Sequence, residues 1–352
     1  MMPADYRVAC DPDSKVDDAR EAVDRSLLHP QHLSRYLRAN TVRLPFRYNA
    51  TRTGQLEAVV KRDRLLAEEI QRVEERQKRM LQYVETVAEH GVWTMSYLLK
   101  GLPLANLYPE RCRDIGDIDI VVRNRADLRQ LLGALAKSGV TLQKLRVYDI
   151  DEGFGEMLFY IPTFHLSLTV HYGGVPVVGG TRLLIDLSRG EKEVSLGQVT
   201  VNVPSAEHLL AIICANTLRH GYCKWRDVLD FSYVVGANHN KMDWAYLHEV
   251  CALNKLLAVY EGFMRFVKES PPLPTRGSPF SWRAFGPRLC KLSCGSVASP
   301  LFVGKYLVSR RGFAYGLLYG LLLGVDRLRR HPKDSALSRL SCRAGFSRRR
   351  KL

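Results

Sequence analysis

Residues 98–122 read LLKGLPLANLYPERCRDIGDIDIVV, and the end of this stretch decides the fold. Asp117 and Asp119 lie two residues apart in a β-prone run in which isoleucine and valine fill the alternate positions. Alternate side chains of a strand share one face of a sheet, so the two carboxylates face the same way. Adjacent carboxylates repel each other unless a cation lies between them. Mg²⁺ prefers oxygen ligands of this kind and keeps its other positions for water and phosphate. The pattern predicts a Mg²⁺ site at Asp117 and Asp119.

The beginning of the same stretch has the features of a phosphate-binding loop. A β-prone run at residues 92–99 ends at Lys100 and Gly101, and a short helix is expected at residues 102–108. Glycine lets the backbone approach a phosphate closely, and the N-terminus of a helix favours anions. Lys100 adds a cation for a triphosphate, and Arg113 adds another further along. The whole stretch predicts a site that positions a nucleoside triphosphate for in-line attack at phosphorus.

Simpler interpretations of these residues stay open at this point. Asp117 and Asp119 could form a solvated strand face, because an Asp-x-Asp pair occurs on many exposed strands. Lys100 could be an ordinary surface cation. Arg113 could pair with a nearby aspartate instead of binding nucleotide.

The periodicity of the remaining chain predicts an α+β fold. One or two short helices are expected in the first fifty residues, and residues 55–90, without Gly or Pro, predict one long amphipathic helix or two abutting ones. The order after that is strand, short helix, strand, helix and then a run of strands, which is not the order of a doubly wound parallel sheet. The expected strands are residues 113–122, 140–147, 157–161, 164–172 and 199–203, and the expected helices are residues 126–137, 205–219, 224–236 and 244–268.

These elements divide the chain into four parts. Residues 1–90 are an N-terminal helical region, and residues 91–204 are the core with a mixed sheet. Residues 205–270 are a helical domain. Residues 271–352 hold a linker, an apolar segment and a basic C-terminal tail.

Four segments of the chain resemble a known family. They are RDRLLAEEIQ, YLLKGLPLANLYPERCRDIGDIDIVV, HLSLTVHYGG and PSAEHLLAIICANTLRHGYCKWRDVLDFSYVV. They look like the uncharacterised nucleotidyltransferases of the polymerase-β superfamily, and the resemblance covers residues 63–238. It implies a polymerase-β-type nucleotidyltransferase core in which Gly101 lines the phosphate loop and Asp117 and Asp119 bind the catalytic metals.

The chain departs from the pattern of that family at one position. The family's third carboxylate comes from a neighbouring strand, two residues before a histidine-aromatic pair. Here the pair is His171 and Tyr172, and Thr169 stands where the acid is expected. Threonine is a poor metal ligand and a poor base at neutral pH. His171 is therefore a candidate general base, since its ordinary pKa is near ~6.5, although it could equally be a structural residue.

The expected helices at residues 205–236 carry further polar candidates. Asn216 and His220 are four residues apart on one helical face, and Lys224 and Arg226 follow. By analogy with the superfamily, His220 and Lys224 border the nucleotide. An amphipathic pair of helices that only packs against the core is the alternative.

Charge and hydropathy single out the end of the chain. The net charge is +16, and residues 301–352 alone contain thirteen Lys/Arg and two Asp/Glu. Such a tail could contact nucleic acid or an anionic membrane, or it could be solvated and disordered. Residues 312–325 read GFAYGLLYGLLLGV, which is too short for a spanning helix of about 20 residues. A core helix, a helix-dimer seam or an interfacial membrane anchor would each account for this segment.

The eight cysteines show no zinc-ligand spacing and predict reduced, mostly buried thiols. No apolar leader begins the chain, because Asp5 and Arg7 interrupt it, so a cytoplasmic location is expected, with membrane association through residues 312–325 as a further possibility.

The function expected from the sequence is transfer of a nucleoside monophosphate from a triphosphate such as ATP to an acceptor, with Mg²⁺. The acceptor could be a protein, an RNA or a small molecule. The alternatives are a catalytically weakened nucleotide-binding regulator, suggested by Thr169, and an accessory protein whose basic tail binds membrane or nucleic acid.

Overall fold

The computed structural model describes residues 3–177, 181–220, 223–269, 273–275 and 278–280. Four helices occupy the first fifty residues, where one or two were expected: α1 (Pro3–Ala9), α2 (Val16–Ser26), α3 (Pro30–Asn40) and α4 (Arg43–Arg52). Each is short and places only a few apolar residues in the core. Helices of 7 to 11 residues span only two or three turns, which explains why the sequence alone undercounts them.

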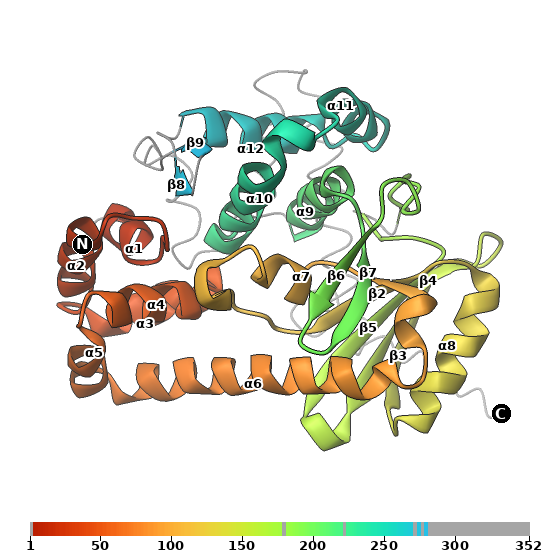
Figure 1. Cartoon of the computed structure of the whole chain (residues 1–352), viewed down its shortest axis with the longest axis horizontal. Coiled ribbons are helices and arrows are strands. Elements are labelled where there is room, and N and C mark those ends of the chain that lie inside the picture. The colour runs from red at the N-terminus through yellow and green to blue at the C-terminus, as the bar shows by residue number, and fades with distance from the viewer. Residues whose placement is uncertain (1–2, 178–180, 221–222, 270–272, 276–277, 281–352) are drawn as a thin grey trace, which may run out of the picture.

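The region at residues 55–90 forms two helices, α5 (Leu56–Arg62) and α6 (Arg64–Ala88). They separate at Asp63, whose extended backbone (φ −146°, ψ 84°) breaks the helix and whose carboxylate accepts a hydrogen bond from the backbone N–H of Leu66. This is an N-cap interaction. With 25 residues, α6 is about 37 Å long and runs from the N-terminal helices to the sheet (Figure 1).

A mixed sheet of five strands forms the centre of the fold, as the α+β prediction requires. Its strands, in the spatial order β1-β2-β5-β4-β3, are β1 (Ser96–Leu98), β2 (Ile118–Val122), β5 (Leu166–Tyr172), β4 (Phe154–Ile161) and β3 (Thr141–Asp149). Only the β2–β5 pair is parallel. Three expected strands are shorter than predicted. A 3-10 turn, Val92–Thr94, precedes β1, residues 113–117 lead into β2 without joining it, and β5 begins only after a 3-10 turn at Pro162–Phe164.

Helices and a two-stranded sheet surround this centre. Helices α7 (Leu102–Ala105) and α8 (Arg125–Lys137) follow β1 and β2, and a hairpin of β6 (Lys192–Leu196) and β7 (Val199–Val203) precedes α9 (Ala206–His220) and α10 (Trp225–Asn238). The expected helix at residues 244–268 is two helices, α11 (Trp244–Leu253) and α12 (Leu257–Glu269). The chain turns between them at Lys255, which has φ +58°. Part of the expected linker forms a small hairpin, β8 (Leu273–Thr275) and β9 (Ser278–Phe280).

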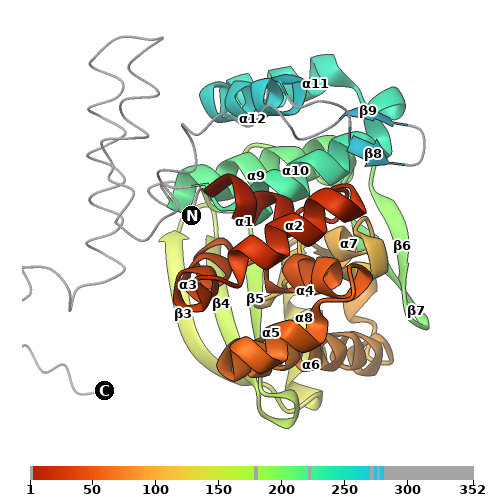
Figure 2. The ribbon, with the colours of Figure 1, turned by 90° about the vertical axis from the view of Figure 1, so that its left-hand side faces the viewer.

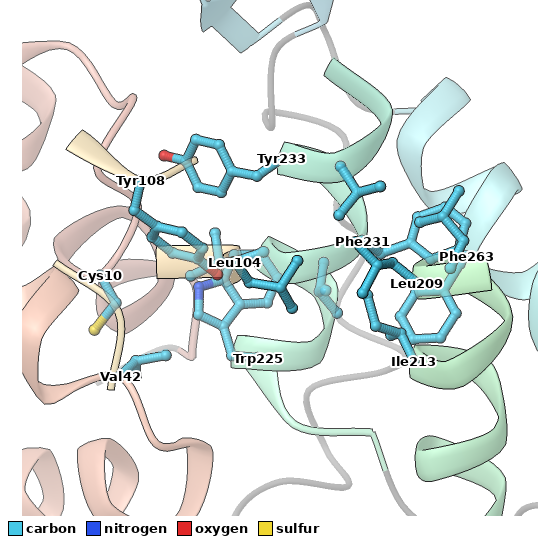
Figure 3. Packing of buried hydrophobic residues seen from close by; sticks show 14 of the residues in the cluster. Cys10, Val42, Leu104, Tyr108, Leu209, Ile213, Trp225, Phe231, Tyr233 and Phe263 are labelled. Atoms are coloured by element: carbon cyan, nitrogen blue, oxygen red, sulfur yellow. The ribbon is translucent and has the colours of Figure 1, made fainter. Parts of the chain in front are cut away.

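The two faces of the five-stranded sheet have different roles. The apolar residues of one face pack against α8 and the C-terminal half of α6 in a closed core that includes Ile118, Ile120, Leu168 and Val170. A second core joins the N-terminal helices to α9, α10 and α12, which lie close together in Figure 2. Figure 3 shows part of it, where the rings of Phe231 and Phe263 stack 4.7 Å apart. The other face of the sheet is left for polar residues beneath α9.

Several predictions concern the end of the chain. Residues 312–325 and the basic tail at residues 301–352 lie outside the described residues. Within the described residues, no helix combines the length and the hydropathy that a membrane crossing requires. The five cysteines described are free, and four of them are buried, as expected.

Candidate active site

A polar cavity of about 230 Å³ lies between α9 and the sheet. Its polar lining combines carboxylates and cations from five elements, β2, β3, β4, β5 and α9, and from the loops after β1 and before β2. These residues are Lys100, Asp117, Asp119, Arg146, Glu156, Thr169, His171, Asn216, Arg219 and His220. Of the eight residues predicted for the site, five line the cavity: Lys100, Asp117, Asp119, His171 and His220.

Strand register places the polar residues on one face. Asp119 of β2 pairs with Thr169 of β5, and Val121 pairs with His171. On the far side of β5, His171 pairs with Glu156 of β4. Residues two apart on a strand face the same way, so Asp119, Thr169, His171 and Glu156 all point toward the cavity. The polar residue expected to replace the missing acid, Thr169, is directly beside Asp119.

The two aspartates have different surroundings. Asp119 is buried (6% exposed), with its Oδ2 3.4 Å from Lys100 Nζ, whereas Asp117 is exposed at the mouth of the cavity. Burial opposes ionisation of Asp119, but Lys100 and His171 outweigh it and hold its pKa below the ordinary value. The pKa of Asp117 is raised, first by the negative charge of Asp119 and then by desolvation. The second negative charge therefore costs free energy unless a cation is bound.

This donor set fits Mg²⁺. Asp117 and Asp119 offer carboxylate oxygens to the same cavity, and the described part of the chain has no cluster of three His, Cys, Asp or Glu residues that could enclose a metal. An open site with two carboxylates suits Mg²⁺, which usually binds one or two protein carboxylates together with substrate phosphates and water. The mutual repulsion at Asp117 is the electrostatic feature that a divalent cation would relieve.

Gly101 holds the loop that follows β1 in a conformation that side chains disfavour. Its φ of +91° and ψ of −111° lie outside the regions open to other residues. The position of a Cβ would be 3.7 Å from the backbone oxygen of Asp117, so the loop passes close to the aspartates. The helix after it, α7, has only four residues, and its dipole is correspondingly small. Glycine geometry and Lys100, more than a helix terminus, make this loop suitable for phosphate.

Arg113 is placed differently from the prediction. Its guanidinium is buried (2% exposed) and makes two hydrogen bonds to the carboxylate of Asp230 on α10, of 2.6 and 2.7 Å. Tyr108 donates a hydrogen bond to the same carboxylate. Arg113 also donates to the backbone oxygen of Gly101 at 3.3 Å. Arg113 does not line the cavity but ties the Gly101 loop to α10. Asp230 is 117 residues away in the sequence. The partner of Arg113 is therefore not a nearby aspartate, which was the alternative considered from the sequence.

A group of basic residues lies near the aspartates on the side of α9 and α10. His220 lines the cavity. The charge of Arg226 favours the ionised form of Asp117, and the charge of Asp117 favours the ionised form of Lys224. The pKa of Lys224 is lowered, first by burial and then by the charge of Arg226. Lys100 Nζ is anchored from the same side by a hydrogen bond to Asn216 Oδ1 of 3.1 Å. Lys100, Lys224 and Arg226 form a cationic wall beside the carboxylates, a suitable arrangement for a polyphosphate.

His171 lies between two carboxylates. Its Nε2 is 3.7 Å from Asp119 Oδ1, and its Nδ1 is 3.8 Å from Glu156 Oε2. The ring is 5% exposed, and Nδ1 has no hydrogen-bond partner. His171 is therefore inside the site, near Asp119.

Glu156, Arg146 and Arg219 are cavity residues that sequence reasoning missed. Glu156 forms ion pairs with Arg146 of β3 and with Arg219 of α9. Burial raises the pKa of Glu156, but Arg219, His171 and Arg146 together hold it below the ordinary value. A single acid in the strand FGEMLFYI does not indicate a functional site by itself, because only the pairing of β4 with β5 brings Glu156 opposite His171.

The geometry unites carboxylates, a glycine loop and a cationic wall around one cavity, which is an arrangement that can bind a metal–nucleotide complex. A search among curated proteins found no match to the chain. A family model described as uncharacterised nucleotidyltransferase matches residues 27–270, a range that includes every residue of the cavity. The chain thus belongs to this family of uncharacterised nucleotidyltransferases.

Proposed function

We propose that this protein is a Mg²⁺-dependent nucleotidyltransferase that moves a nucleoside monophosphate from a triphosphate, such as ATP, to the hydroxyl group of an acceptor. Membership of the family supports a nucleotidyltransferase role in general. The single observation that carries the specific proposal is the convergence of Asp117, Asp119 and Lys100 on one cavity beside the Gly101 loop.

In this proposal, Asp117 and Asp119 hold Mg²⁺, which would neutralise phosphate charge and polarise the phosphorus that is attacked. Lys100 beside Asp119, His220 at the end of α9 and Lys224 at the start of α10 bind the triphosphate. Lys100 is held in place by its contacts with Asp119 and Asn216. The glycine loop approaches the phosphates through its backbone, and Arg113 keeps that loop attached to α10.

The reaction requires a bond change at the α-phosphorus. The acceptor oxygen forms a bond to this phosphorus while the bond to the bridging oxygen breaks, and pyrophosphate leaves with the electron pair of that bond. The acceptor proton passes to a base. His171 is our candidate for this base, because its Nε2 lies in the cavity 3.7 Å from Asp119.

A product assay tests the proposal. The full chain is incubated with α-labelled ATP, GTP, CTP or UTP and Mg²⁺, in the presence of co-purifying protein and RNA or of a small-molecule extract. Label that moves to any of these acceptors, and that is lost in the Asp117→Asn variant, supports the proposal. A wild-type protein that binds no nucleotide with Mg²⁺ refutes it.

A second candidate function is that of a nucleotide-binding regulator with little or no turnover. The observation that favours it is Thr169, which occupies the position beside Asp119 where an acid is expected. Metal-dependent nucleotide binding by wild type, together with no product under any of the acceptor conditions, would favour the regulator over the enzyme.

A further inference from the structure

The position beside Asp119 lacks an acid, yet the same cavity contains a third carboxylate on the next strand. Thr169 of β5 is opposite Asp119, and its other neighbour, Leu158 of β4, is apolar. Two residues along the same face of β4, Glu156 lines the cavity and is 4% exposed. The chain therefore supplies its third acid one strand farther from Asp119 than the family pattern does.

The imidazole of His171 fills the space between Glu156 and Asp119. Its two nitrogens face one carboxylate each, at 3.8 Å for Glu156 and 3.7 Å for Asp119. Both distances exceed a normal hydrogen bond, and neither Glu156 Oε2 nor His171 Nδ1 has a hydrogen-bond partner. Two buried polar atoms that face each other without bonding would gain from a shift of about 1 Å, and contacts of catalytic groups often tighten in this way when substrate binds.

We propose that Glu156 is the third acid of this site and that it acts as a positioning residue, by holding His171 with Nε2 toward Asp119 and the attacking hydroxyl. The proposal rests on the transferase function proposed above. A carboxylate on one ring nitrogen fixes the orientation and tautomer of an imidazole and makes the other nitrogen more basic. The acceptor proton would pass to His171 Nε2 as the new oxygen–phosphorus bond forms.

A purely structural role for Glu156 makes a different prediction. Glu156 also pairs with Arg146 and Arg219, so it could serve only to attach α9 to the sheet. In that case its removal should alter stability and leave His171 unaffected. If Glu156 positions His171, its removal should change the ring environment of His171 even without metal or nucleotide.

The test compares Glu156→Gln with a matched control, Glu152→Gln. Glu152 also pairs with an arginine, Arg182 at 3.0 Å, but it is 55% exposed and does not line the cavity. The first measurement is the ¹⁵N NMR spectrum of the histidine rings in the metal-free full chain, with His171 assigned from a His171→Gln variant. We expect both ring nitrogens of His171 to shift in Glu156→Gln and to stay unchanged in Glu152→Gln.

The second measurement is steady-state transfer with Mg²⁺ and nucleotide. We expect kcat to fall about 10–100-fold in Glu156→Gln, the usual loss when a partner of a working histidine is removed, while KM for nucleotide stays within about twofold. The double variant Glu156→Gln/Thr169→Asp has an acid directly beside Asp119, and its kcat should be at least about tenfold higher than that of Glu156→Gln alone. Glu156→Asp keeps the charge for both arginines but moves it away from His171, and it serves if Glu156→Gln does not fold.

The outcomes separate this inference from the function on which it rests. An active wild type together with an unchanged His171 spectrum and unchanged kcat in Glu156→Gln overturns the role of Glu156 alone. A wild type without nucleotide-dependent transfer overturns the proposed function. In that event the His171 spectrum still shows whether Glu156 positions the ring.

Discussion

Asp117→Asn and Asp119→Asn should change the stability of the protein in opposite directions. Repulsion between neighbouring carboxylates suggests that loss of either one is neutral or slightly stabilising, but the structure distinguishes them. Asp117 is exposed, and its pKa is raised first by the charge of Asp119, whereas Asp119 is buried against Lys100. We expect Asp117→Asn to stabilise the metal-free protein and Asp119→Asn to destabilise it.

The magnitudes follow from the geometry. Alternate residues of an extended chain are about 7 Å apart, and two unit charges at that spacing repel by about 2 kcal/mol at an effective dielectric constant near 20. Solvent at Asp117, together with the opposing charges of Lys100 and Arg226, reduces the gain to roughly 0.5–1 kcal/mol, or about 1–3 °C in Tm. Asp119→Asn leaves Lys100 without its carboxylate partner and should cost about 1–3 kcal/mol.

The pH dependence of the Asp117 effect has a definite sign. Because the pKa of Asp117 is raised in the folded state, the folded protein binds more protons than the unfolded chain between the ordinary and the raised pKa. The wild type therefore loses stability as pH rises through this window. The advantage of Asp117→Asn should be present at neutral pH and should disappear below about pH 4, where the aspartate is protonated in both states.

Thermal and urea unfolding with and without Mg²⁺ and a non-hydrolysable triphosphate provide the assay. At a ligand concentration of about 100 Kd, the wild type should gain about 2.7 kcal/mol, and both variants should lose most of that gain. Asp151→Asn, an exposed aspartate outside the cavity, is the control and should behave as wild type. The reasoning fails if both variants unfold severely, or if either one keeps the full stabilisation by Mg²⁺ and nucleotide.

Three further predictions concern other parts of the site. Arg113→Ala removes the guanidinium that makes two hydrogen bonds to the buried carboxylate of Asp230 and should lower the free energy of unfolding by about 3–5 kcal/mol in a urea titration; a loss below about 1 kcal/mol would contradict the importance of this pair. Gly101→Ala forces a side chain into a disfavoured backbone conformation, so it should lower the free energy of unfolding by about 1–3 kcal/mol and weaken nucleotide binding measured by calorimetry. Gly116→Ala is the control: Gly116 has open space around it and no positive φ, so neither quantity should change. His171→Ala should reduce transfer by roughly 10²–10⁴-fold in the labelled-nucleotide assay, and full activity in this variant would assign the base to another residue.

Local features of the chain were sufficient to predict that Asp117 and Asp119 face the same cavity. Asp117 and Asp119 are two residues apart, and the backbone of a strand fixes which way they face without help from distant residues. The same holds for the loop at Gly101, which follows a strand, and for helix α8, whose apolar residues recur on one helical face. The aspartates, the loop and α8 agree with the sequence because their conformations depend on near neighbours.

Other residues could be placed only by contacts between distant parts of the chain. The sequence predicted Arg113 as a nucleotide ligand, but in the structure it pairs with Asp230 of α10. Nothing in the local sequence specifies this pairing. The number of N-terminal helices was also missed, because helices this short are stabilised by the core that they share with α9 and α10.

The sequence by itself thus determined the α+β class from the order of strands and helices, the nucleotidyltransferase family from segments across residues 63–238, and the pair of aspartates from their spacing. Only the tertiary structure placed Glu156 opposite His171 and put Arg146 and Arg219 beside it. The physical reason is that strand register and helix docking are set by the summed burial of many side chains, so the neighbour of a polar residue across a sheet is not encoded in its local sequence.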